Sequence, residues 1–301
     1  MSTEGQPPAP SAIPDPSFAP AHPATALPHL GTYRRRLPVS LERLYENAID
    51  WEHLPYLHAS SFAAIECLDS GSWGFRARVH ARARGESPGE QTTIELVLDR
   101  ASRRWITRTL DGRNAGAEVW THAFPMQRRR TEIVVDFFAP NVPPAGRARI
   151  ASAYVALYTR LYDEDVAMMV ERQKRLDARI DSESGPAEAV IGRVSALAFP
   201  LEATFRGRRY VVARVGGDSD GELVAYTPTC PHRAGPLSRQ PDANGAVRCP
   251  WHGYRFDVRT GACLSGAPCR LPPAPRVHVD QHGTARLIAA TSGNADRATP
   301  D

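Results

Sequence analysis

The sequence predicts an α+β protein in which an antiparallel sheet domain with helices is followed by an all-β domain. Two patterns predict the first domain: strand-like segments separated by turn signals fill residues 72–138, and a helical pattern follows at 147–179. A third observation favours a separate second domain, because the chain beyond residue 190 contains the strand-like segments 204–215 and 222–227. At 301 residues the chain is long enough for two hydrophobic cores.

Proline dominates the beginning of the chain. Eight prolines lie between Pro7 and Pro28, where they break helices and leave little apolar surface to bury. The same stretch lacks the basic start and apolar core of a secretory signal. We therefore expect this division of the chain: a disordered tail at 1–32, folded domains at 33–180 and 191–290, a linker at 181–190, and a second disordered tail at 291–301.

The first domain is expected to open with a helix at Ser40, an N-cap candidate followed by Leu41 and Leu44 at helical spacing. Residues 72–83 then alternate, with Phe75 and other apolar residues on one face and arginines on the other, as in a half-buried strand. Further strand candidates in this domain are 93–99, 105–110, 118–124 and 131–138. In the second domain they are 204–215 and 222–227.

Charge and cysteine usage limit the classes of partner and compartment. The net charge is +4 and the arginines are scattered, so we expect no nucleic-acid partner and favour an acidic protein as any electrostatic partner. No segment has transmembrane length, so no membrane partner is expected. Cys67, Cys263 and Cys269 are expected to be free thiols in a reducing cytosol, which predicts a cytoplasmic protein.

The most informative stretch places Cys230 and His232 at C-x-H spacing, then Cys249 and His252 at C-x-x-H spacing sixteen residues later. Prolines and glycines beside each pair allow the tight turns that bring the two side chains to one centre. Two thiolates can hold one iron of a [2Fe–2S] cluster while two neutral imidazoles hold the other. A structural zinc site is the alternative, but zinc spacings normally keep cysteines together and histidines together.

In these residues, from about 188 to 289, the sequence resembles a Rieske [2Fe-2S] domain. The resemblance is to the low-potential oxygenase or ferredoxin type, because the two loops lack the second pair of cysteines that forms a disulfide in cytochrome-type Rieske proteins. Tyr254 occupies a position where high-potential Rieske proteins place a hydroxyl donor to a bridging sulfide. The resemblance therefore leaves the reduction potential open.

A second candidate site lies at the end of the first predicted helix, where Asp50, His53 and His58 form a D-x-x-H-x-x-x-x-H pattern. On an unbroken helix, residues five apart diverge by about 140°, so the two histidines converge only if the helix distorts or ends. Pro55 makes such a break plausible. Asp50 is three residues from His53, which places a carboxylate beside a candidate ligand. Alone, the pattern is more typical of surface or core histidines than of ligands.

A carboxylate in the long helical pattern supplies a third candidate ligand. Asp165 falls within its apolar stripe, and a buried carboxylate is costly unless it is paired or bound to metal. Two histidines and one carboxylate are the facial ligand set of non-haem iron(II) oxygenases. Asp163 is the alternative ligand, and an ordinary acid on the helix surface is the other interpretation.

Together with the Rieske motif, the histidine pattern resembles the iron-binding motif of Rieske non-haem iron oxygenases. The resemblance implies that His53 and His58 bind a mononuclear non-haem Fe(II), and that Asp50 connects the cluster to it. It also implies a helix-grip (START/SRPBCC-like) fold for the catalytic domain at 33–180. The family normally places the Rieske domain first, so this chain reverses the order and has a short catalytic segment.

The resemblance further implies a set of partners. The enzyme would take O₂ and an organic, aromatic or apolar, small-molecule substrate, with electrons from a ferredoxin or a flavin reductase. Hydroxylation, demethylation and desaturation are all family reactions. We expect a homotrimer in which Asp50 receives the electron from the Rieske domain of a neighbouring subunit. Two alternatives remain: a Rieske electron carrier whose first domain docks a partner, and a first domain that binds an apolar ligand without catalysis.

Overall fold

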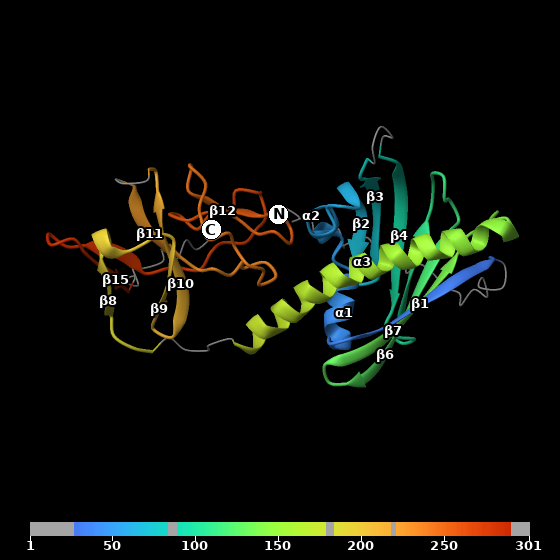
Figure 1. Ribbon diagram of the computed structural model, residues 1–301, viewed down its shortest axis with the longest axis horizontal. Coiled ribbons are helices and arrows are strands. Elements are labelled where there is room, and N and C mark those ends of the chain that lie inside the picture. Colours follow the sequence, from blue (N-terminus) through green and yellow to red (C-terminus); the bar gives the residue numbers. More distant parts are fainter. Residues whose placement is uncertain (1–26, 84–88, 179–183, 218–220, 290–301) are drawn as a thin grey trace, which may run out of the picture.

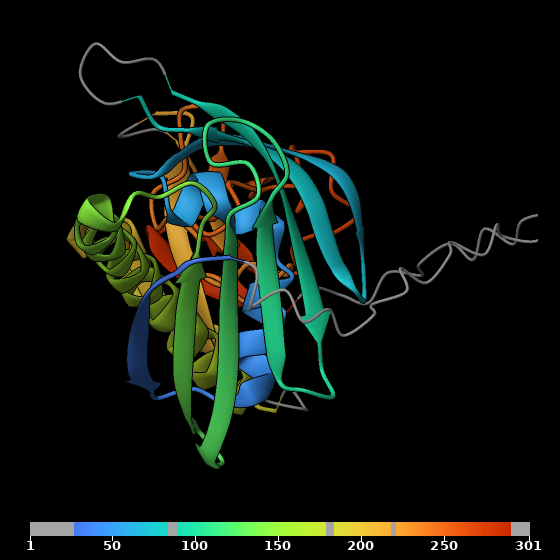
Figure 2. The same cartoon turned by 90° about the vertical axis from the view of Figure 1, so that its right-hand side faces the viewer.

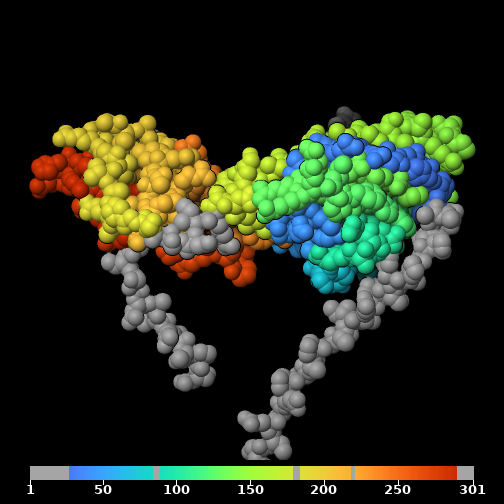
Figure 3. All heavy atoms as spheres, turned by 90° about the horizontal axis from the view of Figure 1, so that it is seen from below, coloured from blue at the N-terminus to red at the C-terminus, as the bar shows by residue number. Residues whose placement is uncertain are grey.

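The computed structural model describes residues 27–83, 89–178, 184–217 and 221–289. They form two domains side by side, joined by a long helix that reaches from the first toward the second (Figure 1). In the space-filling view the two domains appear as lobes that meet at a narrower waist (Figure 3). The predicted tail at 291–301 lies outside the described residues, as do residues 1–26 of the tail predicted at 1–32. Residues 29–32 of that first tail belong instead to strand β1.

One seven-stranded antiparallel sheet forms the body of the first domain, in the order β1-β7-β6-β5-β4-β3-β2. Its strands curve across the domain, with the long helix on one side of them (Figure 2). The strands are β1 His29–Leu37, β2 Phe62–Gly71, β3 Gly74–Ala81, β4 Gln91–Asp99, β5 Arg104–Thr109, β6 Glu118–Gln127 and β7 Arg130–Phe138.

Two of these strands were not predicted. In β2 the pairing with β3 shifts register twice, between Phe62 and Ala64 and between Cys67 and Asp69, so the alternation of period two is lost from the sequence. β1 begins at His29, inside the segment predicted to be a tail, and forms an edge of the sheet against β7. Its run of arginines hides the inward-facing apolar residues at 30, 33 and 37.

Three short helical segments follow β1: α1 Leu41–Ala48, η1 Trp51–His53 and α2 Leu54–Leu57. Ser40 caps α1 as predicted, because its hydroxyl accepts a hydrogen bond from the backbone N–H of Arg43 at 3.4 Å. Pro55 lies in the first turn of α2, where the missing N–H costs nothing. A 3-10 turn that ends at His53 and an α-turn that ends at Leu57 thus replace one regular helix, and the two histidines lie at the two ends of α2.

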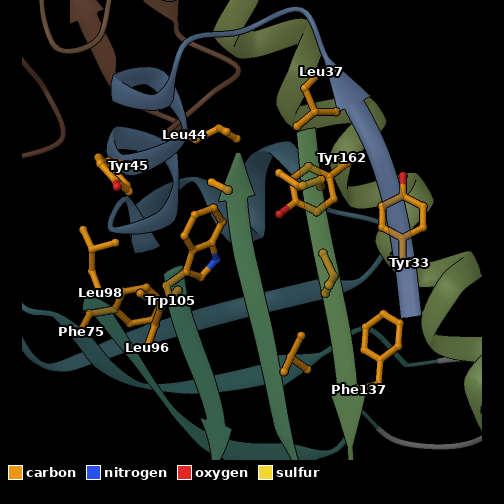
Figure 4. Packing of buried hydrophobic residues seen from close by; sticks show 14 of the residues in the cluster. Tyr33, Leu37, Leu44, Tyr45, Phe75, Leu96, Leu98, Trp105, Phe137 and Tyr162 are labelled. Atoms are coloured by element: carbon orange, nitrogen blue, oxygen red, sulfur yellow. The ribbon is translucent and has the colours of Figure 1, made fainter. Parts of the chain in front are cut away.

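The long helix α3, Pro144–Asp177, packs against the sheet and closes the helix-grip arrangement that we predicted. Aromatic side chains dominate this contact: the Phe137 ring stacks on Tyr154 at 4.9 Å between centroids. Figure 4 shows the core between sheet and helix, with Tyr162 of α3 facing the strands. No helix in the part of the chain that the structure describes is long and apolar enough to cross a membrane.

The second domain is built from β-strands and turns. Its sheets have the orders β11-β10-β9, β12-β13 and β14-β15-β8. The segment 204–215, predicted as one strand, is two strands that turn at Arg206 and Gly207, both of which have positive φ. The elements are β8 Glu188–Arg193, η2 Val194–Ala196, β9 Leu201–Phe205, β10 Arg208–Val215, β11 Glu222–Tyr226, β12 Ala246–Arg248, β13 Arg255–Asp257, β14 Arg276–Val279 and β15 Thr284–Ile288.

Helix α3 belongs to both domains, because its last turns lie against the second one. Met168 is buried in the hydrophobic cluster that contains Trp251. Arg172 donates a hydrogen bond to the carbonyl oxygen of Arg233 at 3.0 Å, and Arg175 donates one to the Thr229 hydroxyl at 2.7 Å. These contacts fix the position of the second domain relative to the first.

We expect β1 to be indispensable and the residues before it to be dispensable. A chain that begins at Leu27 should keep the melting temperature of the full chain. A chain that begins at Val39 loses three buried side chains, at 30, 33 and 37, and each such loss costs roughly 2–5 kcal/mol. It should therefore not give a cooperative thermal transition by circular dichroism. Equal melting temperatures for the two truncated chains would contradict this assignment.

Candidate metal centres and their contact

Two tight loops of the second domain present the predicted cluster ligands. In the first, the N–H of Cys230 donates to the carbonyl oxygen of Gly235 at 2.8 Å. In the second, the N–H of Cys249 donates to the carbonyl oxygen of Tyr254 at 2.8 Å, and Gly253 turns the chain with φ of +70°. A side chain on Gly235 would collide with the Cys249 sulfur, so the two loops are in close contact.

The four side chains meet at one point. The rings of His232 and His252 lie 4.6 Å apart between centroids, and the Nδ1 atom of each is buried without a hydrogen-bond partner. Buried polar atoms without a partner are rare in folded proteins. Cys230 and Cys249 are also buried, with their thiols hydrogen-bonded to each other. Two thiols and two unsatisfied imidazole nitrogens fit a Rieske [2Fe–2S] cluster, which would satisfy all four.

The two thiols release their protons unequally. The hydrogen bond from Cys230 lowers the pKa of Cys249 to about 5, while the same bond and burial raise the pKa of Cys230 far above its ordinary value. The first proton therefore leaves readily, and the second leaves only when a cation neutralises the paired thiolate charge. This behaviour is typical of thiols that bind metal.

The predicted histidine and aspartate ligands form a second cluster, in the first domain. One ligand atom each from His53, His58 and Asp165 lie within 4.8 Å of one another, and all three residues are buried. The Nε2 atoms of His53 and His58 lie 3.4 and 3.1 Å from the same carboxylate oxygen, Oδ1 of Asp165. This geometry could hold one metal ion on one side and leave further coordination positions open.

The carboxylate of Asp165 is held in its charged form. Burial alone would raise its pKa, but hydrogen bonds from His53 and His58 outweigh burial and hold the pKa well below its ordinary value. Asn47 adds a third donor, because its amide nitrogen lies 3.0 Å from Oδ1. Asp163 is elsewhere: its side chain is 58% exposed and pairs with Arg35 at 2.6 Å.

Sequence reasoning missed Glu164, whose carboxylate accepts a hydrogen bond from Nδ1 of His58 at 2.6 Å. Burial lowers the pKa of His58, but the hydrogen bonds with Asp165 and Glu164 outweigh it and raise the pKa. A carboxylate on the far nitrogen fixes the ring orientation and leaves Nε2 for a metal. Glu164 directly precedes Asp165 in the sequence, and this neighbouring acid was the signal that could have identified it.

Asp50 lies between the two clusters, and it is buried. Its Oδ2 atom is 2.8 Å from Nε2 of His252 and 4.0 Å from Nδ1 of His53. Arg233 adds a positive charge, with Nε at 3.7 Å from the same oxygen. We expected this connection to form with a neighbouring subunit, but the structure forms it within one chain. The homotrimer remains a prediction, and the contact through Asp50 does not require it.

Tyr254 makes a second contact between the domains. Its ring lies 4.8 Å from that of His232, and its hydroxyl donates a hydrogen bond to Glu52 at 2.6 Å. The hydroxyl is therefore directed at the first domain, and the comparison with high-potential Rieske proteins does not apply to it. Gly253 lies so close to the ring of Tyr56 that a Cβ atom would approach it to 2.2 Å. The contact is therefore closely packed.

Comparisons with known proteins agree with the cluster site. A family model, the Rieske [2Fe-2S] domain, matches residues 189–277. The methylxanthine N1-demethylase NdmA of Pseudomonas putida is 33% identical over 76 residues, which cover 25% of this chain and 20% of the demethylase. The apoptosis-inducing factor 3 of Mus musculus is 45% identical over 42 residues, which cover 14% of this chain and 7% of that protein. The chain thus matches a fifth or less of these relatives.

Solved structures resemble about half of this chain at low sequence identity. The Zhui aromatase/cyclase from Streptomyces sp. R1128 is 18% identical, covers 49% of this chain and 96% of its own, and has a TM-score of 0.40. A START superfamily protein from Mycobacterium smegmatis is 15% identical, covers 50% and 99%, and has a TM-score of 0.37. The strand order and long helix described above make the first domain a helix-grip, START-like domain, and a β-rich Rieske domain follows it.

We expect Asp165→Ala to empty the first-domain site and leave the cluster intact, because the two sites share no ligand. The iron content should fall from about three to about two per chain, since the cluster itself holds two irons. Metal analysis measures the content, and visible absorbance follows the cluster. Asp163→Ala is the matched control and should keep about three. The opposite result for the two variants would move the ligand assignment to Asp163.

Proposed function

We propose that this protein is a Rieske-type non-haem iron oxygenase. It uses O₂ and electrons from a ferredoxin or flavin reductase to oxidise an organic, apolar or aromatic, substrate. The single observation that carries the proposal is the position of Asp50, which contacts His252 of the cluster site and faces His53 of the His-His-Asp site within one chain. A Rieske electron carrier would need no such connection to a buried second site.

The two sites have different roles in the proposed reaction. When bound, a Rieske cluster supplies electrons one at a time and a mononuclear iron activates O₂ beside the substrate. His53, His58 and Asp165 would hold such an iron through three protein ligands, a set that leaves coordination positions open. Glu164 orients His58 through its far nitrogen. The surrounding burial keeps bulk water away from the reacting groups.

Asp50 keeps its charge and orients a cluster ligand. Burial alone would raise its pKa, but the hydrogen bond with His252 and the charge of His53 outweigh burial and lower it. The ionised carboxylate keeps a proton on Nε2 of His252, which leaves Nδ1 free to face the thiols. Asp50 thereby fixes the orientation of one cluster ligand and its distance from His53.

The remaining parts of the proposal concern the electron donor, the cellular location and the oligomeric state. The electron donor would be an acidic protein that binds this basic chain, which carries a net charge of +4. The protein would act in the cytoplasm, consistent with its unpaired Cys67, Cys263 and Cys269. A homotrimer would place three such units together, each with its own contact through Asp50.

We expect Asp50→Asn to slow electron transfer between the sites without emptying either one. The amide keeps the size of the side chain but loses the charge that orients His252, and changes to such partners cost about 10- to 100-fold. Rapid mixing of the reduced protein with O₂ and substrate, followed by cluster absorbance, measures the reoxidation rate. Asp163→Asn, a change to an exposed aspartate on α3, is the matched control and should reoxidise at the wild-type rate.

Dilution separates the within-chain route from a route between subunits. Because the contact lies within one chain, turnover per chain should stay constant when the sample is diluted until sedimentation shows a monomer. Turnover that falls as the oligomer dissociates would favour transfer from a neighbour. A wild-type reoxidation rate in Asp50→Asn would remove Asp50 from the route altogether.

A further inference from the structure

A cavity of about 150 Å³ opens beside the His-His-Asp site, between the sheet and α3. Three strands supply its apolar wall, with Phe75 on β3, Ile94 and Leu96 on β4, and Trp105 on β5. Figure 4 shows Phe75, Leu96 and Trp105 close together across from Tyr162 of α3. His53, His58 and Asp165 line the same cavity, so a molecule in it would lie directly against the candidate iron site.

The volume limits the size of an occupant. A dry apolar cavity of about 150 Å³ is known to bind benzene, whereas sites for drug-sized ligands measure about 300–1,000 Å³. The cavity therefore has room for one six-membered ring. Leu96 and Trp105 are both buried in the core of the domain, where close packing leaves little freedom to move aside. A second fused ring would overlap this wall.

The chemistry of the wall limits the charge of an occupant. The ionisable groups that line the cavity are Asp50, the three candidate iron ligands and two tyrosines. The first four already contact one another. Burial raises the pKa values of Tyr158 and Tyr162, so both hydroxyls stay neutral. A positively charged substrate would lose its hydration without gaining a free counter-charge, because the two carboxylates are already paired, and that loss costs several kcal/mol.

We infer that the substrate is a compact molecule without a positive charge, no larger than about one ring, and that Phe75, Leu96 and Trp105 set this size limit. The inference rests on the proposed function, because it takes the cavity beside the candidate iron site as the substrate site. Thr107, which lies two residues after Trp105 on β5, also lines the cavity and offers a hydroxyl to such a substrate. A hydroxyl or carbonyl on the ring would meet it.

Binding to the metal-loaded protein tests the inference without relying on turnover. Isothermal titration calorimetry should show toluene binding at least about tenfold more tightly than naphthalene, because the second ring meets the wall. Benzylammonium should not bind, because its positive charge finds no free carboxylate. Leu96→Ala should open the wall and improve naphthalene binding by about tenfold. Leu98→Ala is the matched control: Leu98 is a buried leucine on the same strand that does not line the cavity, so naphthalene binding should not improve.

Each outcome separates the size inference from the proposed function. Ile94→Ala, at a half-buried position of the wall, provides the same enlargement if Leu96→Ala does not fold. Naphthalene or benzylammonium bound as tightly as toluene by the wild type would overturn the inference and leave the oxygenase intact. Toluene binding with no oxygen-dependent turnover across a panel of neutral one-ring compounds would support the cavity and overturn the oxygenase.

Discussion

The hydrogen bond between Asp50 and His252 is the interaction on which the arrangement of this protein depends. It buries a charged carboxylate at a domain boundary, and a buried charge is tolerated only when it is paired. His252 and Arg233 supply the pairing from the second domain, and His53 faces it from the first. The two domains therefore complete one another: separating them would leave the Asp50 charge without its strongest partners.

Helix α3 makes this pairing possible because it packs against both domains. It carries Asp165 at the His-His-Asp site, and its last turns hold the second domain through Arg172 and Arg175. Because one rigid helix provides both functions, the distance between the two sites is set by helix geometry rather than by the connecting segment. The same helix, with Tyr158 and Tyr162, also closes the cavity beside the site.

The fold was largely predictable wherever side chains alternate regularly. β3 through β7 and α3 follow clear periods of two or of three to four residues, and each was predicted within a few residues of its bounds. β2 escaped because its bulges break the alternation, and β1 because arginines surround its buried residues. The sequence does not show which aromatic residues line the cavity: Phe75 and Trp105 do, whereas Phe137 and Trp120 pack in hydrophobic clusters and Phe124 is exposed.

The sequence by itself determined the chemistry available to this protein. The predicted cluster ligands lie in two short segments, with Cys230 and His232 in one and Cys249 and His252 in the other. One local turn in each segment is therefore enough to bring its two ligands together. Only the tertiary structure decided how distant residues meet. It separated Asp165 from Asp163, which lie two residues apart but on different faces of α3, and it directed Tyr254 toward Glu52. It also placed Asp50 against His252 of the same chain, because that contact depends on the packing of whole domains and not on any local pattern.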